Sequence, residues 1–258
     1  MRNLLETARI FMSAKTLVIL ATYNEIDNLP RLVDEIFKSA PDVDVLVIDD
    51  NSPDGTGKWC DTKRETEPRL RCLHRSSKQG LGTATMAGMR HAIEQGYELV
   101  INMDADFSHH PRYLPGLIAG IQQTGADVMI GSRYVQGGRI EGWPLKRHLM
   151  SRALNWYARR LLRLHPKDTS GAFRCYRTAT LAKVDFGRVR SRGYSFQEEI
   201  LWHLERAGAR CAEIPITFVD REQGVSKISS REALGAVRLI LGLAVRGCCS
   251  RPAGSCSR

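Results

Sequence analysis

The 258-residue sequence contains no apolar run of the roughly 18 residues that a membrane-spanning helix needs. Its most apolar stretch, residues 234–245, is interrupted by Arg238. The seven cysteines follow no metal-binding spacing, and the N-terminus has no long apolar segment followed by a small-residue cleavage site. These absences exclude an integral membrane protein and a disulfide scaffold, and they predict a reduced, cytoplasmic protein.

Two glycine-rich phosphate-binding motifs are also missing. The turn after the first expected strand has no glycine, so it lacks the Gly-x-Gly-x-x-Gly pattern of dinucleotide-binding proteins. No Gly-Lys-Ser/Thr sequence occurs, and the later Gly80-Leu81-Gly82 segment lacks a third glycine and is typical of a helix start. Hydride transfer and P-loop nucleotide hydrolysis are therefore excluded.

The composition is that of an ordinary globular protein, with 43% hydrophobic residues, 26% charged residues and a mean hydropathy of -0.28. The net charge of +10 is concentrated in two segments. Residues 139–192 contain 14 basic and 3 acidic side chains, and residues 221–258 contain 7 and 2. This clustering favours an anionic partner, which is a nucleic acid, an anionic lipid surface or a phosphorylated substrate.

Apolar, β-branched runs alternate with helical patterns over the first 135 residues, which predicts an α/β fold with a mostly parallel sheet and flanking helices. The expected strands are 16–21, 43–49, 70–74, 99–103 and 128–132. The expected helices between them are 28–40, 56–66, 81–95 and 111–123. Further along, we expect a basic loop at 135–143, helices at 146–164 and 196–207, and a short strand pair at 173–176 and 212–218.

Acidic side chains follow three of the expected strands. Asp104 and Asp106 come directly after an apolar strand, and Glu25 and Asp50 follow two others. Because ligands bind beyond the carboxyl ends of strands in an open parallel sheet, these carboxylates are expected at one edge. Hard carboxylate oxygens bind Mg²⁺ or Mn²⁺, which in turn holds a diphosphate. The pattern predicts a nucleotide and metal site.

Five motifs, taken in order, resemble the signatures of family 2, GT-A-type glycosyltransferases, and most closely those of dolichol- or polyprenol-phosphate mannosyltransferases. The resemblance covers about residues 16–230. The motifs are Ala21-Thr-Tyr-Asn-Glu, Asp49-Asp-Asn-Ser-Pro-Asp-Gly-Thr, Asp104-Ala-Asp-Phe-Ser-His-His-Pro, Gly131-Ser-Arg-Tyr and Arg221-Glu-Gln-Gly-Val-Ser-Lys. The resemblance implies inverting transfer of mannose from GDP-mannose to a polyprenyl phosphate, with Mg²⁺ or Mn²⁺ as cofactor.

The resemblance also assigns the donor-binding residues. Tyr23 and Glu25 are expected at the base and ribose, and Ile48 and Asp50 are expected to line the nucleotide pocket. The family usually has proline where this chain has Ala21, and often has glutamine where this chain has Ser108. Those two positions are departures from the family pattern within the expected donor site.

The expected metal and phosphate residues follow from the same resemblance. Asp104 and Asp106 are the implied metal ligands, with Ala105 between them and Ser108 or a water completing the metal shell. The implied catalytic residues are Asp106 and Arg133, and the later basic residues Arg221 and Lys227 are expected to close over the donor diphosphate. A lipid phosphate is already anionic at neutral pH, so the attack requires no catalytic base.

Two basic amphipathic helices are expected to reach the lipid. The first places Met150, Ala153, Leu154, Tyr157, Leu161 and Leu164 on one stripe, and the second places Leu234, Val237, Leu241 and Ala244 on another. We therefore predict a glycosyltransferase domain at 1–230, an amphipathic helix and basic tail at 231–258, and peripheral binding to the inner face of an anionic membrane. The sequence leaves open whether a separate protein anchors this one to the membrane.

Two alternative functions remain at this point. A transferase of the same fold could use UDP-glucose or another donor, or a saccharide acceptor, for which Asp168, Glu198 and Glu199 are candidate general bases. A basic nucleotide- or nucleic-acid-binding protein without transferase activity is the other. No zinc-finger spacing or aromatic RNA-binding motif occurs, and an acidic metal site repels a phosphate backbone, so we expect no nucleic-acid partner.

Overall fold

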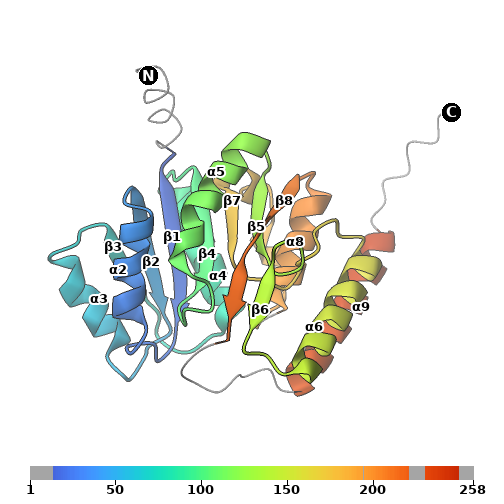
Figure 1. The fold of residues 1–258 in the computed structure, drawn as a ribbon, viewed down its shortest axis with the longest axis horizontal. Helices are drawn as coiled ribbons and strands as arrows, with labels where there is room; N and C mark the ends of the chain where they lie inside the picture. The colour runs from blue at the N-terminus through green and yellow to red at the C-terminus, as the bar shows by residue number, and fades with distance from the viewer. Residues whose placement is uncertain (1–13, 194, 221–229, 250–258) are drawn as a thin grey trace.

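A computed structural model describes residues 14–193, 195–220 and 230–249 of the protein (Figure 1). Within these residues, a seven-stranded sheet has the order β3-β2-β1-β4-β7-β5-β8, and only β7 runs antiparallel to its neighbours. Its strands are β1 (Thr16–Thr22), β2 (Val43–Asp49), β3 (Leu70–His74), β4 (Leu99–Asp104), β5 (Val128–Ser132), β7 (Arg174–Arg177) and β8 (Cys211–Pro215). A separate parallel pair joins β6 (Arg139–Glu141) to β9 (Thr217–Val219).

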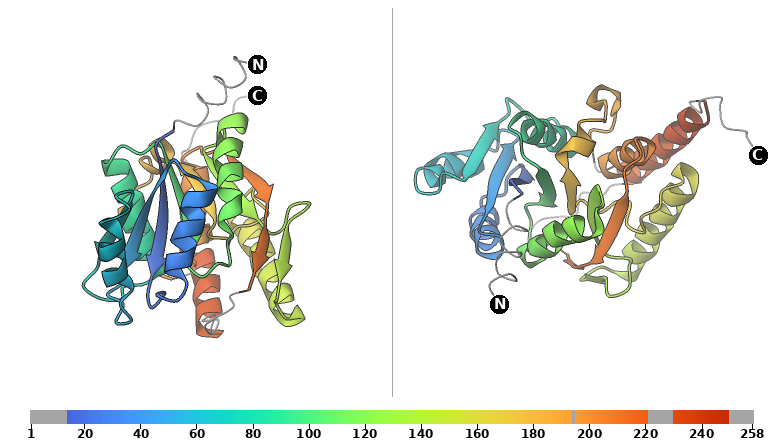
Figure 2. Two further views of the ribbon diagram at one scale, coloured as in Figure 1. Left: turned by 60° about the vertical axis from the view of Figure 1, so that its left-hand side comes forward. Right: turned by 90° about the horizontal axis from the view of Figure 1, so that it is seen from above.

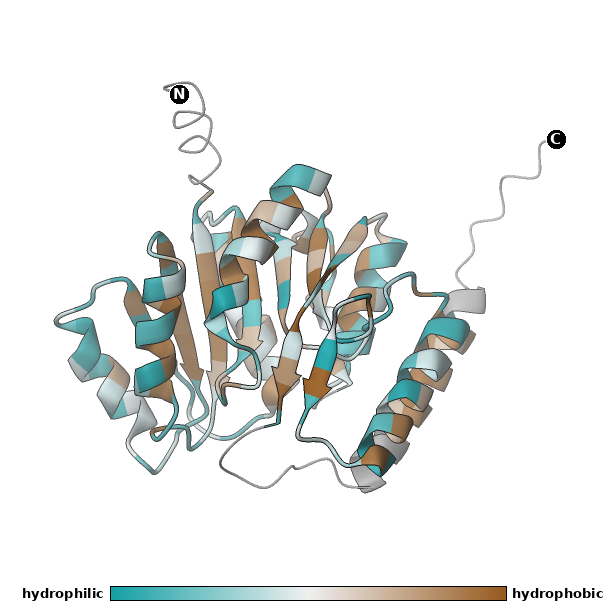
Figure 3. Ribbon diagram, in the orientation of Figure 1, coloured by the Kyte–Doolittle hydropathy of each residue, from teal (hydrophilic) through white to brown (hydrophobic). Residues whose placement is uncertain are grey.

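The central strands are buried on both faces, which explains why they are continuous apolar runs (Figure 3). Successive side chains of β1 point to opposite faces, so Leu17 and Ile19 join one hydrophobic core while Val18 and Leu20 join the other. All five expected strands are confirmed, each to within one residue. The mixed, mostly parallel sheet predicted from the sequence is therefore confirmed.

Helices cover both faces of this sheet (Figure 2). The face that carries Val18 packs against α2 (Leu29–Ser39), α3 (Thr56–Arg64) and α5 (Leu114–Thr124). The opposite face packs against α4 (Leu81–Glu94), the short α7 (Thr178–Leu181) and α8 (Phe196–Arg206). The helix expected at 111–123 divides into a 3-10 turn, η1 (Pro111–Tyr113), and α5, whose first turn contains Pro115. A second 3-10 turn, η2, spans Phe186–Arg188.

The expected strand pair at 173–176 and 212–218 is wrong in its pairing, although both segments form strands. β7 inserts between β4 and β5, whereas β8 adds in parallel to the far side of β5. The second segment also divides in two. β8 ends at Pro215. Ile216 still donates to the Ser132 carbonyl of β5 at 3.0 Å, but its own carbonyl accepts from the Arg139 amide at 2.9 Å, and β9 then joins β6 in the second sheet.

Helices α6 (Leu145–Leu162) and α9 (Ser230–Cys249) lie side by side at one end of the molecule (Figure 1). The expected apolar stripes are only partly the buried ones. Met150 and Leu161 of α6 are exposed, and in α9 Leu241 is exposed while Ile240 and Leu243 are buried. The buried faces differ from the expected stripes because α6 and α9 pack against each other and α9 also packs against α8. Within the described residues, none of the helices has the length and apolar character to cross a bilayer.

Candidate active site

The strand ends that precede the polar motifs lie level with one another at the carboxyl edge of the sheet. Ala21 of β1 pairs with Ile48 of β2 on one side and with Asp104 of β4 on the other. The residues that follow these three positions therefore emerge at the same edge. This register brings the first three sequence motifs together, as their order in the chain predicted.

The Asp-x-Asp segment makes a sharp turn after β4. Phe107 has a φ of 60°, in the left-handed region, and the turn brings the Ser108 amide to donate to Asp106 Oδ1 at 3.1 Å. Ala105 and Asp106 are buried, and the Asp104 side chain is about one third exposed, at 31%. The turn therefore holds both carboxylates at the sheet edge, where a diphosphate and its metal are expected.

Ser108 supplies a further oxygen beside these carboxylates. Its Oγ is buried and has no hydrogen-bond partner among the described residues, although Ser108 lines the same cavity as Asp104 and Asp106. No cluster of three or more His, Cys, Asp or Glu side chains able to hold a metal occurs within the described residues. Two carboxylates and a hydroxyl fit Mg²⁺ or Mn²⁺ when substrate phosphates and waters complete the shell.

His109 is a site residue that the sequence analysis did not assign. Its Nδ1 accepts a hydrogen bond from the Asp104 amide at 3.3 Å, and its ring stacks on Phe173 at 5.1 Å. Burial lowers the pKa of His109 to about 4, so the ring stays neutral at pH 7. This neutral ring therefore fixes the backbone at Asp104, where the Asp-x-Asp turn begins, without adding charge to the site. Its place directly after the Asp-x-Asp motif was the available signal.

Arg133 leaves β5 at the same edge and is held by Asp168. Its Nε and Nη2 donate to the two Asp168 oxygens, each at 2.7 Å, and Nη2 also donates to Ser170 Oγ at 2.9 Å. Burial acts to raise the pKa of Asp168, but the Arg133 charge and hydrogen bonds outweigh it and hold that pKa below its usual value. The pair fixes the guanidinium at the cavity wall in one orientation.

The three candidate general bases have different surroundings. Asp168 is occupied by Arg133, and Glu199 Oε2 accepts from the amides of Arg190 and Ser191 at 3.1 and 2.7 Å. Glu198 lines the cavity, its Oε2 has no hydrogen-bond partner among the described residues, and burial raises its pKa to about 7. The raised pKa of Glu198 suits a base that operates near neutral pH.

The residues expected at the nucleotide base lie beyond β1 and β2. Lys78 Nζ lies 3.8 Å from the centre of the Tyr23 ring, and Asn28 Nδ2 donates to Glu25 Oε2 at 3.0 Å. Asp50 is buried, accepts from the amides of Gln79 and Gly80, and forms an ion pair with Arg75. Tyr23, Glu25 and Asp50, which follow Ala21 and Ile48 in the chain, thus form a polar surface beside the Asp-x-Asp turn.

Ile48 itself is fully buried in the hydrophobic core, where it packs against Gly88 of α4. Its side chain has no surface left for a nucleotide, so any donor contact at this position falls to the backbone. Neither Ile48 nor Tyr23, Glu25 and Asp50 lines the main cavity, whereas Asp104, Asp106 and Arg133 do. The structure therefore divides the predicted donor residues into a group beyond β1 and β2 and a group in the cavity wall.

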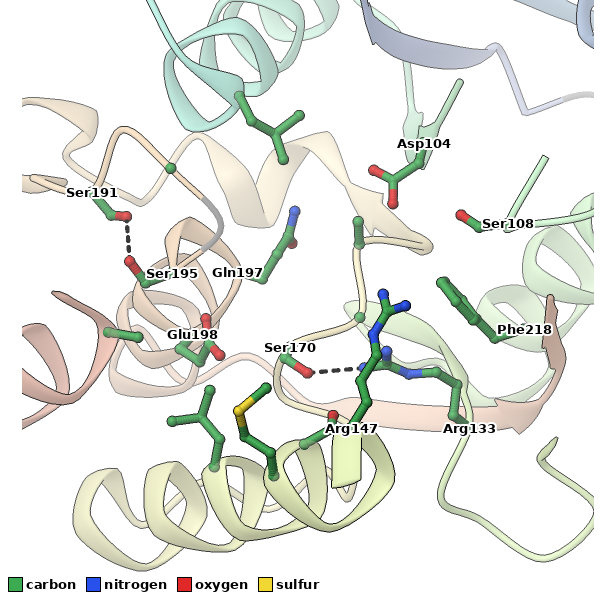
Figure 4. Close-up of a pocket in the computed structure, with 18 of the residues that line it drawn as sticks. Asp104, Ser108, Arg133, Arg147, Ser170, Ser191, Ser195, Gln197, Glu198 and Phe218 are labelled. Carbon is green, nitrogen blue, oxygen red and sulfur yellow. Dashed lines mark hydrogen bonds between the residues drawn. The ribbon is translucent and has the colours of Figure 1, made fainter. Parts of the chain in front are cut away.

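The main cavity has a volume of about 900 Å³ and two chemically different ends (Figure 4). Asp104, Ser108 and Arg133 lie at the polar end. The opposite wall is largely apolar and comes from α6 and α9, with Met150, Ala153, Leu154, Tyr157, Ala236, Val237 and Leu239. Gln197 and Glu198 from α8 line the cavity between these ends. The cavity can therefore hold a ligand with an anionic group and an apolar chain.

Arg147 is a second cavity cation that the sequence analysis did not assign. Its Nη1 donates to both oxygens of Asp220 at 2.9 and 2.8 Å, and its guanidinium lies 4.1 Å from the centre of the Trp143 ring. Figure 4 shows it projecting from α6 toward Arg133. Its position near the start of a basic helix was the only signal. Arg221 and Lys227, expected to close over the diphosphate, lie outside the described residues.

The mostly parallel sheet with helices on both faces is a fold of the GT-A type, which is the fold of glycosyltransferases. The sequence model of glycosyl transferase family 2 matches residues 17–185. The chain belongs to this family, and it is an enzyme of the glycosyltransferase class.

Two relatives are similar to this chain over most of their length. The chain is 44% identical to the undecaprenyl-phosphate mannosyltransferase of Micrococcus luteus over 215 residues, which cover 83% of this chain and 88% of the relative. It is 40% identical to the polyprenol monophosphomannose synthase of Mycolicibacterium smegmatis, over 96% of this chain and 94% of that protein.

Solved structures share the fold at lower identity. Glucosyl-3-phosphoglycerate synthase from Mycobacterium tuberculosis, in complex with Mn²⁺, UDP and glucosyl-3-phosphoglycerate, superposes with a TM-score of 0.65 at 18% identity, covering 97% of this chain and 85% of that one. A mannosyltransferase from Pyrobaculum calidifontis, in complex with GDP-Man and Mn²⁺, gives a TM-score of 0.54 at 16% identity, covering 95% and 77%. These likenesses confirm the fold class.

Proposed function

We propose that the protein transfers mannose from GDP-mannose to the phosphate of a polyprenyl lipid, with inversion at the anomeric carbon. The observation that carries this proposal is the two-ended cavity, in which carboxylates and a buried hydroxyl lie across from an apolar wall. The names of the 40% and 44% identical relatives supply the same substrate class.

The donor occupies the polar edge in this proposal. In it, Tyr23, Glu25 and Asp50 contact the nucleoside, and Asp104, Asp106 and Ser108 would hold a divalent metal that neutralises the donor diphosphate. The GDP-Man and Mn²⁺ complex of the structural neighbour supports this donor and cofactor. When bound, the metal would stabilise the negative charge that builds up on the departing diphosphate.

The acceptor phosphate lies between the polar end and the apolar wall. Arg133 and Arg147 both reach this part of the cavity, and a guanidinium matches the geometry of a phosphate. A phosphate oxygen attacks the anomeric carbon, a new C–O bond forms, and the bond to the donor diphosphate breaks with GDP as the leaving group. The attacking oxygen is already anionic, so the chain supplies alignment rather than a base.

The same proposal places the protein at a membrane surface. Exposed apolar side chains on α6 and α9 include Leu145, Leu149, Trp156, Leu241 and Val245. Basic residues accompany them on α6, which is the composition of helices that bind an anionic bilayer interface. We expect binding to anionic vesicles that weakens as salt is raised, and equal recovery in the soluble fraction at low and high salt would count against it.

The direct test is a transfer assay with radiolabelled GDP-mannose and a short polyprenyl phosphate, with Mg²⁺ or Mn²⁺ or with a chelator. We expect metal-dependent label in the organic phase. Label from UDP-glucose instead of GDP-mannose would overturn the donor assignment while leaving the fold and the lipid acceptor in place.

A hydroxyl acceptor is the second candidate, and Glu198 is the observation that favours it. Its carboxyl lines the cavity and has a pKa raised by burial to about 7, which suits proton removal from a hydroxyl. The Glu198→Gln variant separates the two acceptors. Retained transfer to the lipid phosphate supports the first proposal. Loss of transfer to a hydroxyl acceptor, with an unchanged KM for GDP-mannose, supports the second.

A further inference from the structure

A second cavity, of about 370 Å³, lies on the other side of α6 from the main cavity. Arg152, Trp156 and Arg159 line it, and their spacing of four and three places them on one face of the helix. Met150, Leu154 and Tyr157 line the main cavity from the opposite face. Helix α6 is thus a partition between two cavities.

The second cavity is strongly basic. Arg133, Arg152, Arg159 and Lys167 line it, and no carboxylate does. Asp168 neutralises Arg133, but none of the ion pairs between described residues includes the other three cations. Arg159 Nε is also buried without a hydrogen-bond partner in this part of the structure. Three positive charges and an unsatisfied buried donor therefore surround an open space.

We propose that this cavity binds the phosphate group of an anionic membrane phospholipid. Guanidinium groups form bidentate hydrogen bonds with phosphate, and Lys167 adds a point charge. A phosphodiester would satisfy the buried Arg159 Nε and offset charges that the fold itself leaves without an ion-pair partner.

The exposed apolar residues around the cavity favour a lipid over free phosphate. Trp156 lies in the cavity wall and is 65% exposed, and Leu145 and Leu149 are 73% and 60% exposed. These three residues lie on the same face of α6 as Arg152, so one stripe of the helix presents both apolar and basic groups. Tryptophan prefers the interface between water and the lipid headgroups. Free phosphate would leave these apolar side chains in water, whereas a bilayer would cover them.

The position of the cavity gives the bound lipid a role. Arg133 lies in the wall of both cavities, so a headgroup held on the outer face of α6 lies one side chain away from the proposed transfer site. It would hold α6 at the bilayer with its other face toward the transfer site. This role rests on the proposed membrane function, but binding of the headgroup does not require sugar transfer.

The test uses a phosphatidylglycerol with six-carbon chains, kept monomeric in solution, and measures its binding to the full chain by calorimetry without sugar nucleotide. The pocket variant is Arg152→Gln with Lys167→Gln. The matched control is Lys146→Gln with Arg160→Gln, which removes the same charge from exposed positions that do not line the cavity. Circular dichroism checks that each variant is folded.

We expect the pocket variant to bind about 25-fold more weakly, from about fivefold for each cation, and the control to change less than twofold. Equal weakening of both variants, or no binding to the natural sequence, would overturn the proposal. Inorganic phosphate and phosphatidylcholine with the same chains are the other arms. Binding of phosphate as tightly as phosphatidylglycerol would overturn the lipid source, and equal binding of phosphatidylcholine would overturn the role of charge. Absence of mannose transfer, with lipid binding as expected, would contradict the proposed function and leave the lipid site in place.

Discussion

Glu198 should make the stability of the protein fall as the pH rises from 5 to 8. Burial raises the pKa of this carboxyl from 4.5 to about 7, so the folded state keeps a proton that the unfolded state releases. Stability from the protonated carboxyl is fully present below pH 4.5 and is lost as the pH rises through 7. At about 1.4 kcal/mol for each pKa unit, this group alone lowers the free energy of unfolding by about 2 to 3 kcal/mol between pH 5 and pH 8.

The Glu198→Gln variant cannot titrate at this position. Relative to the natural sequence, its free energy of unfolding should therefore be higher at pH 8 than at pH 5 by about 2 to 3 kcal/mol, so the variant is relatively more stable at the higher pH. Urea unfolding followed by tryptophan fluorescence at both pH values measures this double difference, in which the titration of all other groups cancels.

Asp127→Asn is the control for this measurement. Burial acts to raise the pKa of Asp127, but the Arg210 amide and the Thr180 hydroxyl donate to the carboxylate at 2.8 and 2.9 Å and lower it below its usual value. The stability that Asp127 contributes is lost only as the pH falls through that low pKa. The change in the free energy of unfolding caused by Asp127→Asn should therefore be the same at pH 5 and pH 8. A double difference below about 0.5 kcal/mol for Glu198→Gln would refute the reasoning, because a smaller pKa shift means that water reaches the carboxyl.

Four further predictions follow from the site and its supports. Asp106→Asn should lower mannose transfer by about a thousandfold, while Asp34→Asn, an exposed carboxylate remote from the cavity, leaves it within twofold, as a radiolabel assay would measure. Asp168→Asn should lower the free energy of unfolding by about 3 to 5 kcal/mol because it leaves the buried Arg133 charge without its counterion, and a loss below 1 kcal/mol in urea titration would contradict this. Gly82→Ala should destabilise by about 1 to 3 kcal/mol, since a Cβ there would lie 2.8 Å from the Ser191 carbonyl oxygen and 2.9 Å from Phe196 Cβ, whereas Gly208→Ala meets no atom within 4 Å and tests only the cost of its positive φ. Chelation of divalent metal should abolish transfer without changing the melting temperature by more than a few degrees, because Asp104 and Asp106 belong to neither hydrophobic core, and unfolding on chelation would contradict a purely functional ion.

Much of the sheet was accessible from the sequence because its signals are local. Strands β1, β2 and β4 are continuous apolar runs whose ends carry Glu25, Asp50 and Asp104, and parallel pairing places such ends at one edge. The ordered motifs likewise identified the transferase family before any spatial contact was known. Residues that act through sequence-local turns, such as Asp106 with the Ser108 amide, were found for the same reason.

The partners of β7 and β8 could not be predicted in this way. Pairing across a sheet depends on which edges are left open by the rest of the fold, and nothing in residues 173–218 states that β7 enters between β4 and β5. The occupation of Arg133 by Asp168, 35 residues later in the chain, is equally a product of that insertion. The same holds for the buried state of Ile48, which depends on the packing of Gly88 against it.

The sequence by itself determined the α/β class, the acidic strand edge and the transferase family, because each depends on patterns within a strand, a turn or an ordered set of motifs. Only the tertiary structure decided which side chains face one another. It joined α6 and α9 into the apolar wall opposite Asp104, brought Arg147 and Arg133 to the same Trp143 ring, and separated a second basic cavity on the far face of α6. Helix periodicity defines faces, but the neighbours that pack against a helix decide which face is buried and which lines a cavity.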